Sequence, residues 1–267
     1  MVFNYFYNMQ EQLKITIIQT HLFWENPIEN RKNFTEKIAA IKEKTNLIVL
    51  PEMFTSGFTM NASTLAEEEE SETLKWMQTE AKKNTCAITG SAIITEKGNY
   101  YNRLFFVFPD GTYKTYNKRH TFTLAGEHKT YSAGNEHLIV DYLGWKICPL
   151  ICYDLRFPIW ARNTQDYDAL LYVANWPQKR IAAWDALLKA RAIENMCYCV
   201  GVNRTGTDDN GHHYNGHSAV YDVLGEQVSN LKFENEFTET IELQKLHIEK
   251  NRQHLQFLND RDEFVLK

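Results

Sequence analysis

The sequence lacks the features of several classes of protein. No apolar run approaches the roughly 20 residues that a membrane-spanning helix needs. Lys and Arg number 29 against 34 Asp and Glu, a net charge of −5, so there is no basic excess to attract nucleic acid. Residues 1–12 contain neither the basic nor the apolar region of a signal peptide. We therefore expect neither a membrane nor a nucleic-acid partner.

Cysteines are also few, and they are odd in number. The five of them lie mostly in apolar runs, unlike the paired framework of a small secreted domain. This usage predicts a reduced, cytoplasmic protein without disulfides. The five are Cys86, Cys148, Cys152, Cys197 and Cys199.

Metal-binding and phosphate-binding signatures are absent as well. His212, His213 and His217 cluster, but no cysteine or carboxylate completes the spacing of a structural metal site. The glycines of 201–211 do not form a phosphate-binding loop. The sequence therefore predicts no metal and no cofactor.

The chain is long enough, and has enough hydrophobic residues, to form one hydrophobic core. It has 267 residues, 43% of them hydrophobic and 13% aromatic, and a chain of this size buries roughly three quarters of its unfolded surface. No linker or low-complexity segment divides it. We predict one domain over 13–267, preceded by an N-terminal arm or extension over 1–12. Met9 is a second candidate for the natural start, because a strand-like run follows it.

Periodicity along the chain predicts alternating strands and helices. The β-branched run 13–19 precedes Asn26-Pro27, a helix start, and a face formed by Ile28, Phe34, Ile38 and Ile41. Turn residues separate three runs that predict antiparallel hairpins. A helix is predicted from about Phe157 and another over 181–195, with Leu187, Leu188 and Ile193 inward. The predicted strands are 13–19, 47–50, 86–94, 100–108, 113–116, 138–140, 145–151, 169–174, 197–202, 218–221 and 238–241.

This pattern belongs to the α/β class. Two β-α-β portions joined by hairpins favour two mixed sheets packed face to face with helices outside. Periodicity alone also allows a single doubly wound sheet. The segment after 241 is polar and mixed in composition.

Three reactive side chains come just after predicted strands, where open α/β sheets commonly hold ligands. They are Glu52, Lys118 and Cys152. Each alone has an ordinary structural interpretation, as a capping carboxylate, a surface cation or a buried small side chain. Together they supply a proton carrier, a fixed positive charge and a nucleophile whose thiolate would gain from a helix start and a nearby cation.

The order Glu, Lys, Cys in these motifs resembles the nitrilase (carbon–nitrogen hydrolase) superfamily, from about Leu13 to the C-terminal region. The resemblance implies a four-layer α-β-β-α sandwich and a two-fold dimer that packs outer helices together. It places the general base at Glu52, the lysine at Lys118 and the nucleophile at Cys152. Glu127, within 125–128, matches a further glutamate that supports the lysine.

Several stretches resemble the omega-amidase branch of that superfamily. This branch implies hydrolysis of the terminal amide of 2-oxoglutaramate or 2-oxosuccinamate through a cysteine thioester, with water as the second reactant. Another carbon–nitrogen hydrolase, acting on an aliphatic amide or an N-carbamoyl amino acid, is the alternative within the superfamily. The stretches are 53–58, 118–122, 125–128 with Tyr131, 174–177 and 259–264.

Two further alternatives remain at this stage. A catalytically silent binding scaffold would be expected to lack a triad residue, and all three residues are present. A Cys–His hydrolase would use His120 or His128 as its base.

The substrate pocket is less well defined by the sequence. Phe54, Tyr153 and Trp176 are candidate pocket walls because they adjoin the motifs. A 2-oxo acid carries a carboxylate, which needs a cation or several N–H donors. The candidates for that contact are Arg119, His120, Arg156 and Arg180.

Overall fold

The computed structural model describes residues 11–230 and 234–266. The alternative start at Met9 and most of the predicted arm lie outside the described residues. The helices are α1 (Pro27–Ala39), α2 (Ala62–Leu65), α3 (Glu72–Asn84), α4 (Ile181–Asn195) and α5 (Lys245–Leu255). The strands are β1 (Gln12–Gln19), β2 (Leu47–Val49), β3 (Ala87–Glu96), β4 (Asn99–Val107), β5 (Tyr113–Asn117), β6 (Val140–Tyr142), β7 (Trp145–Ile151), β8 (Ala169–Val173), β9 (Tyr198–Val202), β10 (Thr205–Thr207), β11 (His213–Asn215), β12 (Ala219–Tyr221) and β13 (Phe237–Gln244).

These strands form two mixed sheets and a small hairpin. The six-stranded sheet has the order β13-β1-β2-β3-β4-β5, and the five-stranded sheet has the order β12-β9-β8-β7-β6. The central strands β1-β2-β3 and β7-β8-β9 run parallel, whereas the outer strands pair antiparallel. Strands β10 and β11 pair with each other as a separate two-stranded hairpin. The prediction of two mixed sheets is confirmed.

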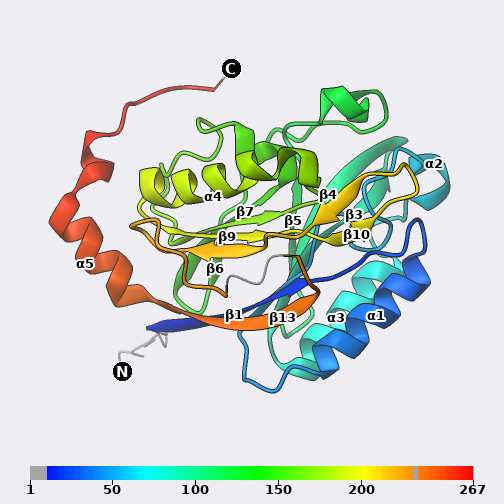
Figure 1. Cartoon of the computed structure of the whole chain (residues 1–267), viewed down its shortest axis with the longest axis horizontal. Coiled ribbons are helices and arrows are strands. Elements are labelled where there is room, and N and C mark those ends of the chain that lie inside the picture. The colour runs from blue at the N-terminus through cyan, green and yellow to red at the C-terminus, as the bar shows by residue number, and fades with distance from the viewer. Residues whose placement is uncertain (1–10, 231–233, 267) are drawn as a thin grey trace, which may run out of the picture.

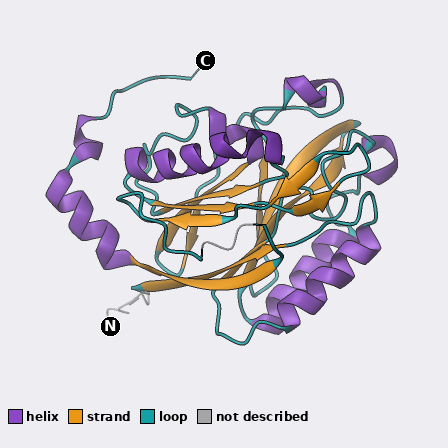
Figure 2. Ribbon diagram, viewed as in Figure 1, coloured by secondary structure: helices purple, strands orange, loops and turns teal. Residues whose placement is uncertain are grey.

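Three of the described helices cover the outer faces of the two sheets (Figures 1 and 2). Helices α1 and α3 lie against the six-stranded sheet, and α4 lies against the five-stranded sheet. Successive side chains of β1 point to opposite faces of its sheet. Ile15 and Ile17 enter the core between the two sheets, whereas Ile18 packs with Phe34 of α1 on the other face. The result is the layered α-β-β-α sandwich that the sequence predicted.

Some side-chain orientations differ from prediction because of helical geometry. Ile28 is 70% exposed and Ile193 is 41% exposed, although both were expected to face inward. Ile28 precedes Phe34 by six residues, and Ile193 follows Leu188 by five, so neither shares the i, i+4 face of its neighbour. The predicted N-cap is confirmed, because the Asn26 side chain accepts a hydrogen bond from the Glu29 N–H at 3.2 Å.

One predicted element needs correction, and one helix was not predicted. No helix begins at Phe157; a 3-10 helix spans Cys152–Arg156, and Phe157 precedes Pro158, which disfavours helical backbone at that residue. The polar C-terminal segment contains α5, which has Ile248 as its one buried residue. Contacts with charged side chains dock this helix, including Arg252 Nε to the Met196 carbonyl at 2.8 Å, and periodicity does not reveal such contacts.

Candidate active site

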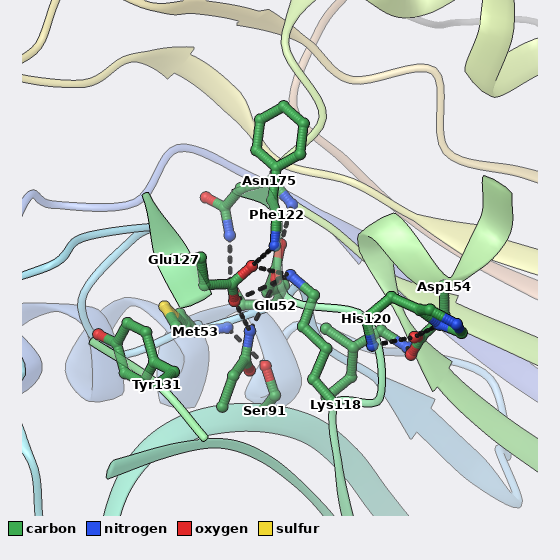
Figure 3. A network of polar contacts seen from close by, with 12 residues as sticks. Glu52, Met53, Ser91, Lys118, His120, Phe122, Glu127, Tyr131, Asp154 and Asn175 are labelled. Atoms are coloured by element: carbon green, nitrogen blue, oxygen red, sulfur yellow. Dashed lines mark hydrogen bonds and ion pairs between the residues drawn. The ribbon is translucent and has the colours of Figure 1, made fainter. Parts of the chain in front are cut away.

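Three side chains predicted from separate motifs meet where strands of the two sheets end. Glu52 follows β2 and Lys118 follows β5, both in the six-stranded sheet, whereas Cys152 follows β7 of the five-stranded sheet. The Lys118 ammonium lies 2.8 Å from Glu52 Oε1 and 3.0 Å from both carboxylate oxygens of Glu127 (Figure 3). The fold therefore brings all four predicted catalytic residues into one place.

Burial makes this charge cluster tightly coupled. Lys118 is 1% exposed, and Glu52 and Glu127 are fully buried. Burial by itself would lower the pKa of Lys118, but the carboxylates of Glu127 and Glu52 outweigh it and raise that pKa. Burial raises the pKa of Glu127, with Lys118 acting in the opposite direction. The lysine is therefore a fixed cation at this site.

Two asparagines hold the Glu52 carboxylate. Asn102 Nδ2 donates to Glu52 Oε1 at 2.8 Å, and the Asn175 backbone N–H donates to Oε2 at 2.9 Å. Asn175 Nδ2 also donates to the Glu52 carbonyl at 2.6 Å. Sequence reasoning missed Asn102, whose only signal is a polar residue shortly before the apolar run 104–107 in β4. These bonds orient Glu52 with its charge in contact with Lys118.

Cys152 begins its 3-10 helix in an unusual backbone conformation, with φ at +44°, and its side chain is nearly buried. Burial, followed by the negative charge of Glu52, raises the pKa of the thiol well above its usual value, and Lys118 opposes this only in part. The cation lowers the thiol pKa, as expected, but burial and the Glu52 carboxylate outweigh it. The ammonium of Lys118 is already shared by two carboxylates.

Cys152 and Lys118 line a cavity of about 540 Å³, a size typical of sites for small molecules. Tyr153 and Trp176 line it too, as predicted. Its wall also includes residues that the sequence did not single out, namely Trp24, Glu25, Phe58, Phe122 and Tyr214.

Phe54 and His120 lie elsewhere, which corrects two of the predicted pocket contacts. Phe54 packs edge-on against Phe34, with ring centroids 5.5 Å apart, in the layer between the sheet and α1. Phe58, four residues later, lines the cavity instead, with its ring 5.2 Å from the Lys118 ammonium. His120 hydrogen-bonds Asp154 rather than lining the cavity.

Two arginines give the cavity positive charge. Arg156 lies over the Trp176 ring at 4.9 Å, and Arg180 lies over the Phe122 ring at 5.0 Å. Within residues 11–230 and 234–266 neither guanidinium has a hydrogen-bond or ion-pair partner. Arg119 differs, because it donates to the Gly134 carbonyl at 3.1 Å and does not line the cavity. Of the candidate arginines, Arg156 and Arg180 are therefore available to bind an anion in the cavity.

No group of three or more His, Cys, Asp or Glu side chains in the described part of the chain is placed to hold a metal ion. Of the helices described, none combines the length and apolar character that crossing a membrane requires.

Comparison with known proteins identifies the family. The model of the carbon-nitrogen hydrolase family matches residues 14–252, most of the chain. The chain belongs to the carbon–nitrogen hydrolase family. This carbon–nitrogen hydrolase is 43% identical over 254 residues to "Omega-amidase YafV" of Yersinia enterocolitica, covering 95% of this chain and 98% of the relative. It is 35% identical over 216 residues to "2-oxoglutaramate amidase" of Bacillus subtilis (strain 168), covering 79% and 83%.

A solved structure supports the same family. XC1258 from Xanthomonas campestris, described as a CN-hydrolase superfamily protein with an arsenic adduct in its active site, superposes with a TM-score of 0.94. It is 39% identical, and the match covers 97% of this hydrolase and all of XC1258. The resemblance inferred from the motifs is therefore confirmed, and this chain is an enzyme that hydrolyses amides.

Proposed function

We propose that this hydrolase releases ammonia from the terminal amide of a small 2-oxo acid, 2-oxoglutaramate or 2-oxosuccinamate, through a thioester on Cys152. The observation that carries the proposal is a cavity that contains Cys152 and Lys118 together with two arginines lacking a carboxylate partner. The names of its relatives, omega-amidase and 2-oxoglutaramate amidase, support it.

The proposed reaction uses the buried cluster in two half-reactions. Glu52 accepts the thiol proton as sulfur attacks the amide carbon, so the raised thiol pKa is overcome only when the base acts. Lys118 and the Tyr153 backbone N–H stabilise the developing oxyanion. Glu52 then gives the proton to the departing nitrogen, which leaves as ammonia. Water attacks the thioester, Glu52 takes its proton, and the acid departs as the thiol is reprotonated.

The arginines match the other end of such a substrate. A 2-oxo acid amide carries one carboxylate, and a guanidinium that already stacks on an aromatic ring can bind it without reorganising. Arg156 stacks on Trp176 and Arg180 stacks on Phe122 in this way. We therefore assign the substrate carboxylate to this pair.

A substrate panel tests the assignment. The purified enzyme is given 2-oxoglutaramate, 2-oxosuccinamate, glutamine, simple aliphatic amides, N-carbamoyl amino acids and a nitrile, and ammonia release is measured. We expect 2-oxoglutaramate to exceed glutamine in kcat/KM by at least about a hundredfold, because the α-ammonium of glutamine would meet the arginines. Rates within tenfold, or preference for a carbamoyl compound or a nitrile, would replace omega-amidase by another activity of the family.

The identity of the base gives a second prediction. Glu52→Gln should lower kcat by about 10²–10⁴-fold, since an amide cannot accept the thiol proton. A Cys–His enzyme with either His120 or His128 as its base would survive that change, and one that uses His128 would fail with His128→Ala. His128 is exposed and does not line the cavity, so His128→Ala should keep full activity and serves as the control. Steady-state ammonia release from both variants decides between the two bases.

Two broader properties belong to the proposal. The five free cysteines are all buried, in keeping with a cytoplasmic location. A two-fold dimer packing outer helices together is proposed from the family resemblance, and isologous dimers are the commonest oligomers.

A further inference from the structure

A buried carboxylate outside the catalytic cluster connects its parts. Asp154 is fully buried, and its two oxygens take part in four hydrogen bonds. Oδ1 accepts from the His120 backbone N–H at 3.0 Å and lies 2.8 Å from His120 Nδ1. Oδ2 accepts from the Tyr116 hydroxyl at 2.8 Å and the Ile151 backbone N–H at 3.0 Å. Every donor lies within two residues of Lys118 or beside Cys152.

The placement of these donors joins the two sheets. Tyr116 is the penultimate residue of β5 in the six-stranded sheet, and His120 lies in the loop beyond Lys118, whereas Ile151 ends β7 of the five-stranded sheet. Figure 3 shows His120 and Asp154 together, beside Lys118. The carboxylate therefore ties the segment that carries the ammonium to the turn that carries the thiol.

The turn at Cys152 needs such support. A non-glycine residue at positive φ is strained and persists only when its surroundings over-determine it. Asp154 supplies a local constraint because its side chain reaches back to the N–H just before Cys152, as an N3 carboxylate does in a capping box. His120 adds a second constraint, since its ring stacks on Phe157 with centroids 3.7 Å apart.

We propose that Asp154 is a positioning residue that fixes the Cys152 thiol relative to the Lys118 ammonium, and that His120 acts through it. The proposal rests on the proposed function for its effect on turnover. A displacement of about 1 Å at a reacting group can cost on the order of a hundredfold in rate. Loss of this carboxylate should therefore affect chemistry more than substrate binding.

Asp154→Asn is the direct test. Asparagine keeps the shape of the side chain, but its Nδ2 cannot accept a hydrogen bond. Some of the four hydrogen bonds made by Asp154 are therefore lost. We expect kcat to fall at least about a hundredfold with KM changed less than about threefold. Alkylation of Cys152 by iodoacetamide, followed by peptide mass analysis, should slow at least about tenfold. The alkylation needs no amide substrate, so it remains decisive even if the substrate panel rejects the proposed function.

The matched control is Asp168→Asn. Asp168 is also buried, accepts the Lys146 N–H at 2.9 Å and pairs with Lys245, but it precedes β8 at the end of the sheet away from the site. The Asp168→Asn variant should have a lower melting temperature, as Asp154→Asn should. Its kcat and its rate of Cys152 alkylation should stay within about threefold of wild type. Equal losses in both variants would show a general stability effect and overturn the proposal.

A second variant keeps the proposal falsifiable if Asp154→Asn does not fold. His120→Phe retains an aromatic ring to stack on Phe157 and removes the Nδ1 contact to Asp154. We expect kcat and the alkylation rate to fall several-fold with KM unchanged. Wild-type kcat and alkylation in either folded variant would overturn the positioning role.

Discussion

Replacing Cys152 with alanine should lower amide hydrolysis by at least about 10⁴-fold while leaving the fold intact. The thiol lines the same cavity as Lys118, and in the proposed mechanism no thioester can form without it. The β-carbon and the backbone conformation are unchanged by the substitution, so we expect stability within about 1–2 kcal/mol of wild type. Ammonia release and thermal unfolding measure the two quantities.

The control for this prediction is Cys86→Ala. Cys86 is fully buried among the apolar side chains beneath α1 and α3, away from the cavity. Its substitution should cost some stability and leave kcat within about twofold of wild type.

Rapidly quenched wild-type enzyme should carry an acyl adduct on Cys152 in intact-mass spectra. Near-normal turnover by Cys152→Ala, or no adduct when acylation outruns hydrolysis, would remove the nucleophile from the proposed mechanism.

Replacing Lys118 with methionine should damage both turnover and stability. Loss of one oxyanion donor costs about 3–4 kcal/mol of transition-state stabilisation, so kcat should fall at least about 10²–10³-fold. The fully buried carboxylates of Glu52 and Glu127 would also lose their cation, and breaking such a buried pair costs about 3–5 kcal/mol in the free energy of unfolding. Kinetics and urea denaturation test the two effects separately.

The stability loss should depend on pH with a defined sign. Lys118 opposes the raised pKa of Glu127, so removing it raises that pKa further. A carboxyl with a raised folded-state pKa favours the fold below its unfolded pKa, about 4.3, and loses that contribution as pH rises through the folded value. The deficit of Lys118→Met should therefore grow from pH 5 to pH 8. A deficit that shrinks over this range would contradict a buried, unpaired carboxylate.

Lys37→Met is the matched control for Lys118→Met. Lys37 pairs with Glu236 at 2.7 Å, but the pair is near the surface, with side chains 22% and 45% exposed. Pairs of this kind contribute about 0–1 kcal/mol, and neither residue of this one lines the cavity. Activity should be unchanged. If Lys118→Met behaved like this control, the cation would have no role at the reacting centre.

Local signals determined most of the fold. Helix α1 follows from Asn26-Pro27 and helix α4 was predicted over its full observed range, because caps and apolar periodicity act within a few residues. The sheets follow from apolar runs and from turn residues between them. Helix α5 was not predicted, since ionic contacts with distant residues dock it rather than an apolar face.

The chemistry of the site was determined by residue type and order, whereas its geometry was decided by tertiary packing. Glu52, Lys118 and Cys152 could be selected because each follows a strand, and strand ends meet at one edge of a fold. The sequence could not place Phe54 on the far side of its sheet, nor show that Asp154 and Asn102 orient the reactive groups. The Asn102–Glu52 contact joins residues 50 positions apart within the six-stranded sheet, and the Tyr116–Asp154 contact joins the two sheets, so only strand pairing and sheet packing bring these side chains within hydrogen-bond distance.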